Sequence, residues 1–175
     1  MKKLFLSLAM MMAVVFSANA QEFSKGDMTL GGSVSFDISN QKDFYSEHDF
    51  SISPAFRYFF ADNWAVGATL SLENGVYKDK INDTKSKYNN IYLAPNISYV
   101  FSIGERWGMA NTVSLYLGLN DSFSTSLYYI PSFYFFINDN WAINAYAGVL
   151  GYDFDAKYFN FNIGSYVGCG VAWRF

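Results

Sequence analysis

The sequence predicts an all-β protein: a single transmembrane antiparallel up-and-down β-barrel of about eight strands. Apolar and small or polar residues alternate along most of the chain with a period of two, which is typical of strands. The connections between the expected strands are short and long in turn, and the long ones carry most of the charge. Aromatic residues make up 21% of the chain and charged residues only 15%, against about 25% in ordinary globular domains.

The first twenty residues predict a secretory signal peptide. A positively charged start precedes an apolar run and the sequence "SANAQ", the small-residue pattern of a cleavage site after Ala20. Cleavage leaves 175 − 20 = 155 residues, and we expect residues 21–175 to form one barrel domain. This part has 10 basic and 15 acidic residues, a net charge of −5, which argues against a nucleic-acid partner. With Cys169 as the only cysteine, an internal disulfide is excluded.

Eight strands follow from the alternation, and none of the sequence between them shows a helical period. The expected ranges are 28–38, 50–60, 64–72, 90–101, 107–119, 126–137, 141–151 and 160–175. The short connections read "ADN", "SIGER" and "NDN", whereas the longer ones span 39–49, 73–89, 120–125 and 152–159. No apolar run after the signal approaches the ~18 residues that a membrane-spanning helix requires.

The two faces of each strand differ in a way that predicts which one points inward. One face is apolar and uncharged in every strand, as in Leu30, Val34 and Phe36 of the first. The other carries Ser, Thr, Asn, Gly and Tyr and few charges, whereas the outside of a soluble barrel would need Lys and Glu to meet water. We therefore expect the apolar face to contact lipid and the polar face to fill the lumen, with the barrel closed so that every amide is paired. A soluble β-sandwich or lipocalin-like barrel is the alternative.

Three prolines fall on the apolar face of every second strand, at Pro54, Pro95 and Pro131. A proline removes one hydrogen bond from a β-ladder and normally marks an edge or a bulge. Pro54 and Pro131 each precede the next tryptophan by ten residues, so we interpret them as a repeated bend. Duplicated ancestry without a mechanical role is the other interpretation.

A repeated motif joins an aromatic run, a polar turn and a tryptophan, as in "FRYFFADNW", "ISYVFSIGERW" and "FYFFINDNW". Indole is apolar with one polar N–H, so tryptophan settles at the boundary between hydrocarbon and lipid headgroups. The sequence therefore predicts an aromatic belt at the end of the barrel that carries the tight turns. Its tryptophans are Trp64, Trp107, Trp141 and Trp173.

The C-terminus "VGCGVAWRF" alternates apolar residues and ends on an aromatic one. In this respect the chain resembles the outer-membrane β-barrel proteins of Gram-negative bacteria, and its repeated hairpin unit resembles small porin-like barrels of Bacteroidota. The OmpX and OmpA transmembrane domains are similar in architecture. The resemblance implies that Val171, Trp173 and Phe175 are a signal for the barrel-assembly machinery. It also implies an integral outer-membrane protein with both termini in the periplasm and the longer loops outside.

Two groups of charged residues are candidates for function. The connection "YKDKINDTKSKYNN" carries Lys78, Lys80, Lys85 and Lys87, which we interpret as a solvated loop or as a contact for lipopolysaccharide phosphates. The lumen face carries few charges, which we expect to join the tyrosines and asparagines of the lumen in a polar plug, since charges away from bulk water need partners. These are Asp37, Asp49, Arg57, Glu73 and Arg174, the first, second and fourth lying toward the outside. The alternative is that these charges form a gate or an ion path through the lumen.

The working function is a structural or surface-interaction role for a monomeric barrel with a plugged lumen, since eight strands leave an interior that side chains just fill. Its partners would be outer-membrane lipid and lipopolysaccharide, with no cofactor and no metal. The alternatives are a narrow porin-like channel or hydrophobic-solute conduit, and, less favoured, an enzyme that modifies lipid A. Such enzymes use a histidine with a serine and an acid, and the single histidine, His48, lacks a serine at the next position on its own face.

Overall fold

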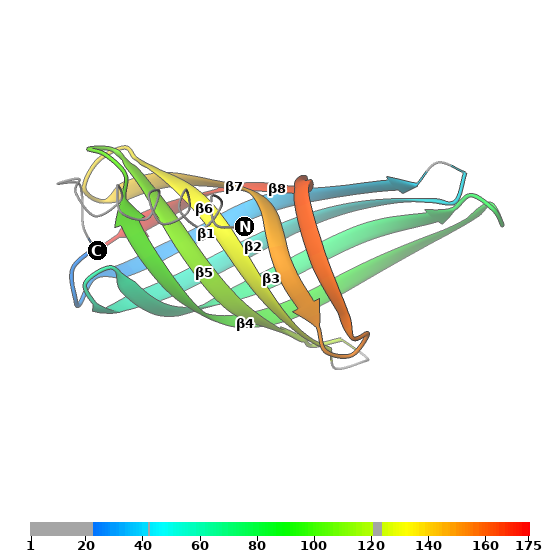
Figure 1. The fold of residues 1–175 in the computed structure, drawn as a ribbon, viewed down its shortest axis with the longest axis horizontal. Coiled ribbons are helices and arrows are strands. Elements are labelled where there is room, and N and C mark those ends of the chain that lie inside the picture. Colours follow the sequence, from blue (N-terminus) through cyan, green and yellow to red (C-terminus); the bar gives the residue numbers. More distant parts are fainter. Residues whose placement is uncertain (1–22, 42, 121–123) are drawn as a thin grey trace, which may run out of the picture.

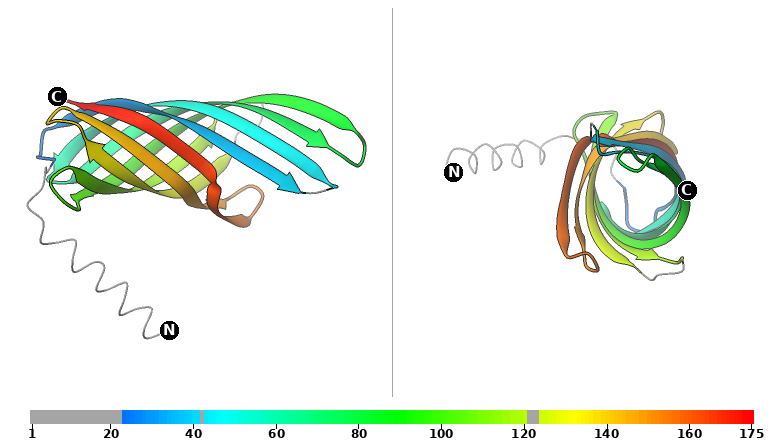
Figure 2. Two further views of the ribbon diagram at one scale, coloured as in Figure 1. Left: turned by 90° about the horizontal axis from the view of Figure 1, so that it is seen from above. Right: turned by 90° about the vertical axis from the view of Figure 1, so that its right-hand side faces the viewer.

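The computed structural model describes residues 23–41, 43–120 and 124–175, with the side chains of residues 147 and 163–166 excepted. In these residues eight antiparallel strands follow one another around a closed barrel, as predicted (Figures 1 and 2). The strands are β1 (Met28–Gln41), β2 (Tyr45–Ala61), β3 (Trp64–Asp79), β4 (Thr84–Ser102), β5 (Trp107–Gly118), β6 (Thr125–Phe136), β7 (Trp141–Asp153) and β8 (Tyr158–Arg174). The expected signal peptide lies outside the described residues. No helix in the described part is long and apolar enough to cross a membrane.

The barrel has two unlike ends. At one end, called the turn end, lie the short connections and the C-terminus (Figure 1). At the other, called the hairpin end, β1–β2 and β3–β4 project well beyond the remaining strands (Figures 1 and 2). Closure is made by β1 and β8, which pair from Thr29 with Arg174 to Asp37 with Tyr166.

The polar face of the strands points into the lumen and the apolar face points outward, as the alternation predicts. In β1, for example, Thr29 and Ser35 are buried, whereas Leu30 and Phe36 are more than half exposed. The outward-facing large apolar residues form a continuous band around the barrel, called the apolar band, which ends at Leu72 in β3 and gives way to Asn74. A barrel whose exterior is apolar and whose interior holds hydroxyls is the arrangement of a membrane-embedded sheet.

The prediction of long loops is wrong for two of the connections, because most of their residues belong to strands. Segment 39–49 is shortened to a turn between Gln41 and Tyr45, and segment 73–89 to a turn between Asp79 and Thr84. Their high charge indicated loops. Above the apolar band, however, the outward-facing side chains are polar as well, so the alternation in hydropathy disappears although the strands remain paired. The Asp79 carboxylate stabilises the second turn by accepting hydrogen bonds from the amides of Ile81 at 2.8 Å and Asn82 at 3.2 Å.

Each proline interrupts the β-ladder toward the following strand. Pairing of β2 with β3 is missing at Pro54, pairing of β4 with β5 is missing at Pro95, and the register of β6 against β7 shifts at Pro131. A further bulge at Gly148, whose φ is 140°, shifts the register of β7 against β8. Beyond this bulge Val149, Gly151 and Asp153 point inward, which strict alternation from Trp141 would have placed outside.

Lumen tyrosines lie against glycines on neighbouring strands. A β-carbon added at Gly75, Gly151 or Gly168 would overlap the ring of Tyr88, Tyr128 or Tyr146, respectively. The absent side chain therefore makes room for a ring inside a narrow barrel. Hydroxyl pairs fill other parts of the lumen, with Ser53 and Ser71 at 3.0 Å and Ser98 and Thr112 at 2.9 Å.

Replacement of Gly151 by alanine should therefore destabilise the barrel. The new β-carbon overlaps the Tyr128 ring, and overpacking of this kind costs about 1–3 kcal/mol of unfolding free energy. Urea unfolding in detergent micelles measures it. Gly104→Ala is the control, because its added carbon meets no atom within 4 Å. Equal stability of the two variants would contradict this account, and Tyr128→Ala should relieve the strain in Gly151→Ala.

Candidate functional site

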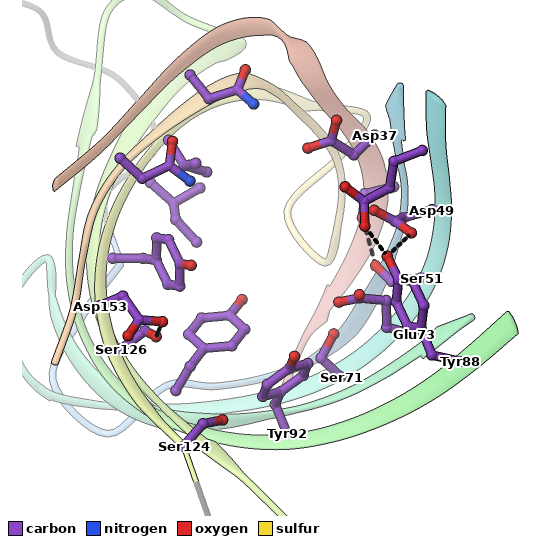
Figure 3. Close-up of a pocket in the computed structure, with 18 of the residues that line it drawn as sticks. Asp37, Asp49, Ser51, Ser71, Glu73, Tyr88, Tyr92, Ser124, Ser126 and Asp153 are labelled. Carbon is purple, nitrogen blue, oxygen red and sulfur yellow. Dashed lines mark hydrogen bonds between the residues drawn. The ribbon is translucent and has the colours of Figure 1, made fainter. Parts of the chain in front are cut away.

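A cavity of about 320 Å³ opens inside the barrel toward the hairpin end and is called the outer cavity (Figure 3). Tyrosine rings, serine hydroxyls and two asparagines form most of its wall. Five carboxylates also face it, and no basic residue is among the described residues that line it. They are Asp37, Glu47, Asp49, Glu73 and Asp153. The first four come from the neighbouring strands β1, β2 and β3, while Asp153 lies across the cavity on β7 (Figure 3).

Tyr88 of β4 links two carboxylates of the outer cavity, Glu47 and Asp49 of β2. Its hydroxyl donates to Glu47 at 2.7 Å or to Asp49, and because it has one proton the two acids share it (Figure 3). Burial and these two acceptors raise the pKa of Tyr88 far above its usual value, so the phenol stays neutral and acts as a donor. Burial also raises the pKa of Asp49, an effect that the Tyr88 hydrogen bond opposes.

Glu73 lies one residue beyond Leu72, above the apolar band, and is the carboxylate most affected by its surroundings. Burial, followed by repulsion from Asp49, raises its pKa from 4.5 to about 7. Asn90 donates a hydrogen bond to it at 3.4 Å, which only partly compensates. At neutral pH the side chain is therefore balanced between its charged and neutral forms.

The structure separates the five charges that the sequence placed in one lumen network. Asp37, Asp49 and Glu73 line the outer cavity together. Arg57 lies deeper, where its Nη1 donates to the Tyr134 hydroxyl at 3.1 Å. Arg174 lies at the turn end and forms an ion pair with Asp27 at 2.7 Å.

Sequence reasoning missed two of the outer-cavity acids, Glu47 and Asp153. Both fell in segments expected to be loops, so no face was assigned to them. Glu47 would have been found by continuing the inward alternation of β2 past Asp49. Asp153 required knowledge of the Gly148 bulge, for which a lone glycine in a strand is the available signal.

The middle of the lumen is occupied by side chains. Tyr116 and Ile130 line both the outer cavity and a smaller cavity of about 70 Å³ on its turn side, called the inner cavity. Tyr116 also lies 5.1 Å from Tyr128 and 5.9 Å from Tyr92, ring centre to ring centre, with edge-to-face geometry. These rings form a layer between the two cavities.

Aromatic rings fill the turn end of the lumen and are called the aromatic closure: Phe23, Phe59, Tyr134 and Phe136. Phe23, which precedes β1, stacks parallel on Phe59 at 4.3 Å and approaches Phe136 at 5.9 Å. Phe59 is 1% exposed and Phe23 is 5% exposed. The Phe23 backbone accepts a hydrogen bond from the Asn63 amide at 2.9 Å, and the Arg174 guanidinium lies 5.2 Å from its ring.

The predicted aromatic belt lies outside the barrel at the turn end. Trp64, Trp107, Trp141 and Trp173 are each between 39% and 56% exposed. Each contacts another aromatic ring, for example Trp64 with Tyr99 at 4.9 Å and Trp141 with Trp173 at 6.3 Å. Val171, Trp173 and Phe175 also face outward on and just after β8.

The remaining candidates lie on the outer surface near the hairpin end. His48 is exposed on β2 and pairs in register with Ile38 and Val76, so apolar residues flank it across both neighbouring strands. Lys78, Lys85 and Lys87 are exposed on the outward face of the β3–β4 hairpin, whereas Lys80 bonds Asn40 of the β1–β2 hairpin at 2.8 Å. Among the described residues no three histidine, cysteine or acidic side chains are arranged to hold a metal ion.

Comparison with solved structures shows the fold. The outer membrane protein OprG from Pseudomonas aeruginosa matches 90% of this chain and 99% of its own, with a TM-score of 0.54 and 15% identity. A designed transmembrane β-barrel matches 88% of this chain and 99% of its own, with a TM-score of 0.52 and 10% identity. No family model and no characterised relative matches the sequence. The chain therefore has the fold of a small eight-stranded outer-membrane barrel.

The environment of Glu73 predicts a pH-dependent stability. The pKa of Glu73 is higher in the folded barrel than its ordinary value of 4.5. The protonated side chain therefore makes its full contribution to the unfolding free energy below pH 4.5, and this contribution is lost as the pH rises through about 7. Glu73→Gln, which stays neutral, should be more stable than wild type by about 1–3 kcal/mol near pH 8. Near pH 4.5 the two should be nearly equal. Urea unfolding at both pH values measures this, and an advantage independent of pH would contradict it.

Proposed function

We propose that this protein is an integral outer-membrane barrel whose lumen is closed to solutes and whose projecting hairpins act at the cell surface. The observation that carries the proposal is the aromatic closure. The gap beside Phe23, Phe136 and Arg174 measures about 10 Å³, no more than a single water occupies. A second layer, at Tyr116 and Ile130, lies between the closure and the outer cavity.

The direction of the barrel in the membrane is part of the proposal. Belt tryptophans at the turn end and polar hairpins at the other end support a periplasmic turn end and an external hairpin end. Both termini would then lie in the periplasm. The outward-facing Val171, Trp173 and Phe175 would be read by the assembly machinery before the barrel closes.

The hairpin end offers a surface for anionic lipid. Lys85 and Lys87 occupy outward positions of β4 above the apolar band, close to where lipopolysaccharide phosphates would lie. Lys78 shares this face and pairs with Asp83 at 3.1 Å in an exposed ion pair, which costs little to break. We infer that these three lysines hold the β3–β4 hairpin against the headgroups.

A narrow channel or hydrophobic-solute conduit is the second candidate, favoured by the outer cavity. Its 320 Å³ would form the external vestibule of such a path. A solute leaving it would have to displace Tyr116 and then the stacked Phe23 and Phe59. We propose no catalytic role, since His48 stands between apolar neighbours on the outer surface.

Planar-bilayer recordings test the closure. Wild-type protein should show no steady open current, because rings fill the lumen at two levels. Phe23→Ala/Phe136→Ala should increase the frequency and size of openings by removing the ring stacked on Phe59 and the ring that lies against Phe23. Phe133→Ala is the matched control, since Phe133 belongs to the same strand as Phe136 but faces outward and is 54% exposed. A steady current through the wild-type protein would support the channel instead.

Binding to vesicles that contain lipopolysaccharide tests the lysine surface. The triple change of Lys78, Lys85 and Lys87 to glutamine should weaken binding about tenfold or more at low salt, since each lysine near an anionic surface contributes about 1 kcal/mol. Lys80→Gln is the control, because Lys80 is engaged by Asn40 and Gln41. Unchanged affinity of the triple variant would remove this part of the proposal.

A further inference from the structure

The inner cavity differs from the outer one in charge. Arg57 is the only charged residue among the described residues that line it. Much of the rest of its wall is hydroxyl groups, most of them on buried residues. They include Thr29, Ser53, Thr69, Thr112, Ser114 and Ser132. A hydroxyl can rotate to donate its one proton. Ser53 and Thr112 also bond Ser71 and Ser98, and together with the other hydroxyls they place potential donors around the positive charge.

Arg57 is held in place by its neighbours, and no counter-ion for it is found among the residues that the structure describes. It pairs in register with Thr29 of β1 and with Gly67 of β3, whose missing side chain leaves room for the arginine stem. Its Nη1 is bonded to a neutral partner, the Tyr134 hydroxyl, at 3.1 Å. Its Nε is buried and has no partner in the described part of the chain. Arg174, the other lumen arginine, has an ion pair with Asp27.

No carboxylate among the described residues lies within ion-pair distance of Arg57. Asp27 is engaged by Arg174 at 2.7 Å. The acids of the outer cavity lie farther along the strands: the nearest by register is Glu73, whose partner Ser51 is six residues from Arg57 along β2, about 20 Å of extended strand. A cation removed from bulk water without a partner is costly. The cavity therefore favours an occupant that carries negative charge.

We propose that the inner cavity is a binding site for one small inorganic anion of the chloride class. Arg57 supplies the charge and its free Nε one hydrogen bond, while the surrounding serine and threonine hydroxyls supply the others. The volume of about 70 Å³ accommodates a halide with a few waters. A divalent oxyanion would call for a second cation, which the described lining lacks. The site is independent of whether the barrel conducts.

Bromide is the direct probe. Crystals of the detergent-folded protein grown in sodium bromide should show an anomalous-scattering peak in the inner cavity, within hydrogen-bonding distance of the Arg57 guanidinium. Water alone at that position, without anomalous signal, would overturn the proposal. The same would follow from a peak that persists unchanged in Arg57→Gln.

Unfolding in chloride and in gluconate at equal ionic strength is the solution test, because screening is then the same in both salts. Chloride should lower the unfolding equilibrium constant of the wild type, approaching a tenfold decrease for each tenfold rise in concentration above the dissociation constant. Arg57→Gln should lose this dependence, whereas Arg57→Lys, which keeps the charge, should retain most of it. An equal dependence in wild type and Arg57→Gln, or none in wild type, would overturn the proposal.

Discussion

Backbone pairing around a closed sheet with an apolar outer face is what holds this structure together, and it is interrupted at only a few places such as Pro54 and Pro95. In hydrocarbon no water can replace a missing hydrogen-bond partner of the backbone. An open sheet edge is therefore excluded, and β1 has to pair with β8. The seam between them is reinforced where it ends. Met28 and Phe175 exchange backbone hydrogen bonds at 3.0 and 3.1 Å, and the Arg174–Asp27 ion pair lies beside them.

Closure also decides the character of the interior. Eight strands leave a lumen that side chains just fill, so tyrosine rings there need bare backbone opposite them, as at Gly75 and Gly151. Two larger spaces remain between the described side chains of the lumen. They are the outer cavity of about 320 Å³ and the inner one of about 70 Å³, on either side of Tyr116 and Ile130.

The lumen charges are sorted along the barrel axis. Carboxylates gather at the hairpin end, where four of them come from adjacent strands, while Arg57 and Arg174 lie toward the turn end. The two arginines differ in their surroundings: one is neutralised by an acid of the segment before β1, and the other is surrounded by hydroxyls. This separation underlies both the pH dependence at one end and the anion site near the other.

The barrel, its eight strands, the common end of the four tryptophans and the inward and outward faces, apart from the end of β7, could be predicted from the sequence. These follow from period-two alternation, which is local and needs no knowledge of contacts. The alternation also indicated that Asp37, Asp49 and Glu73 would lie toward one end of the lumen.

The length of the hairpins could not be predicted, because strands above the apolar band are held by backbone pairing and show no alternation in hydropathy. The tertiary structure alone brought Glu47 and Asp153 to the outer cavity, the second through a bulge that reverses the faces of β7. It also showed Phe23, from outside every predicted strand, stacked on Phe59. The structure also showed that no described carboxylate lies beside Arg57. The sequence pattern could not indicate this, because contacts across a barrel depend on strand register and distance.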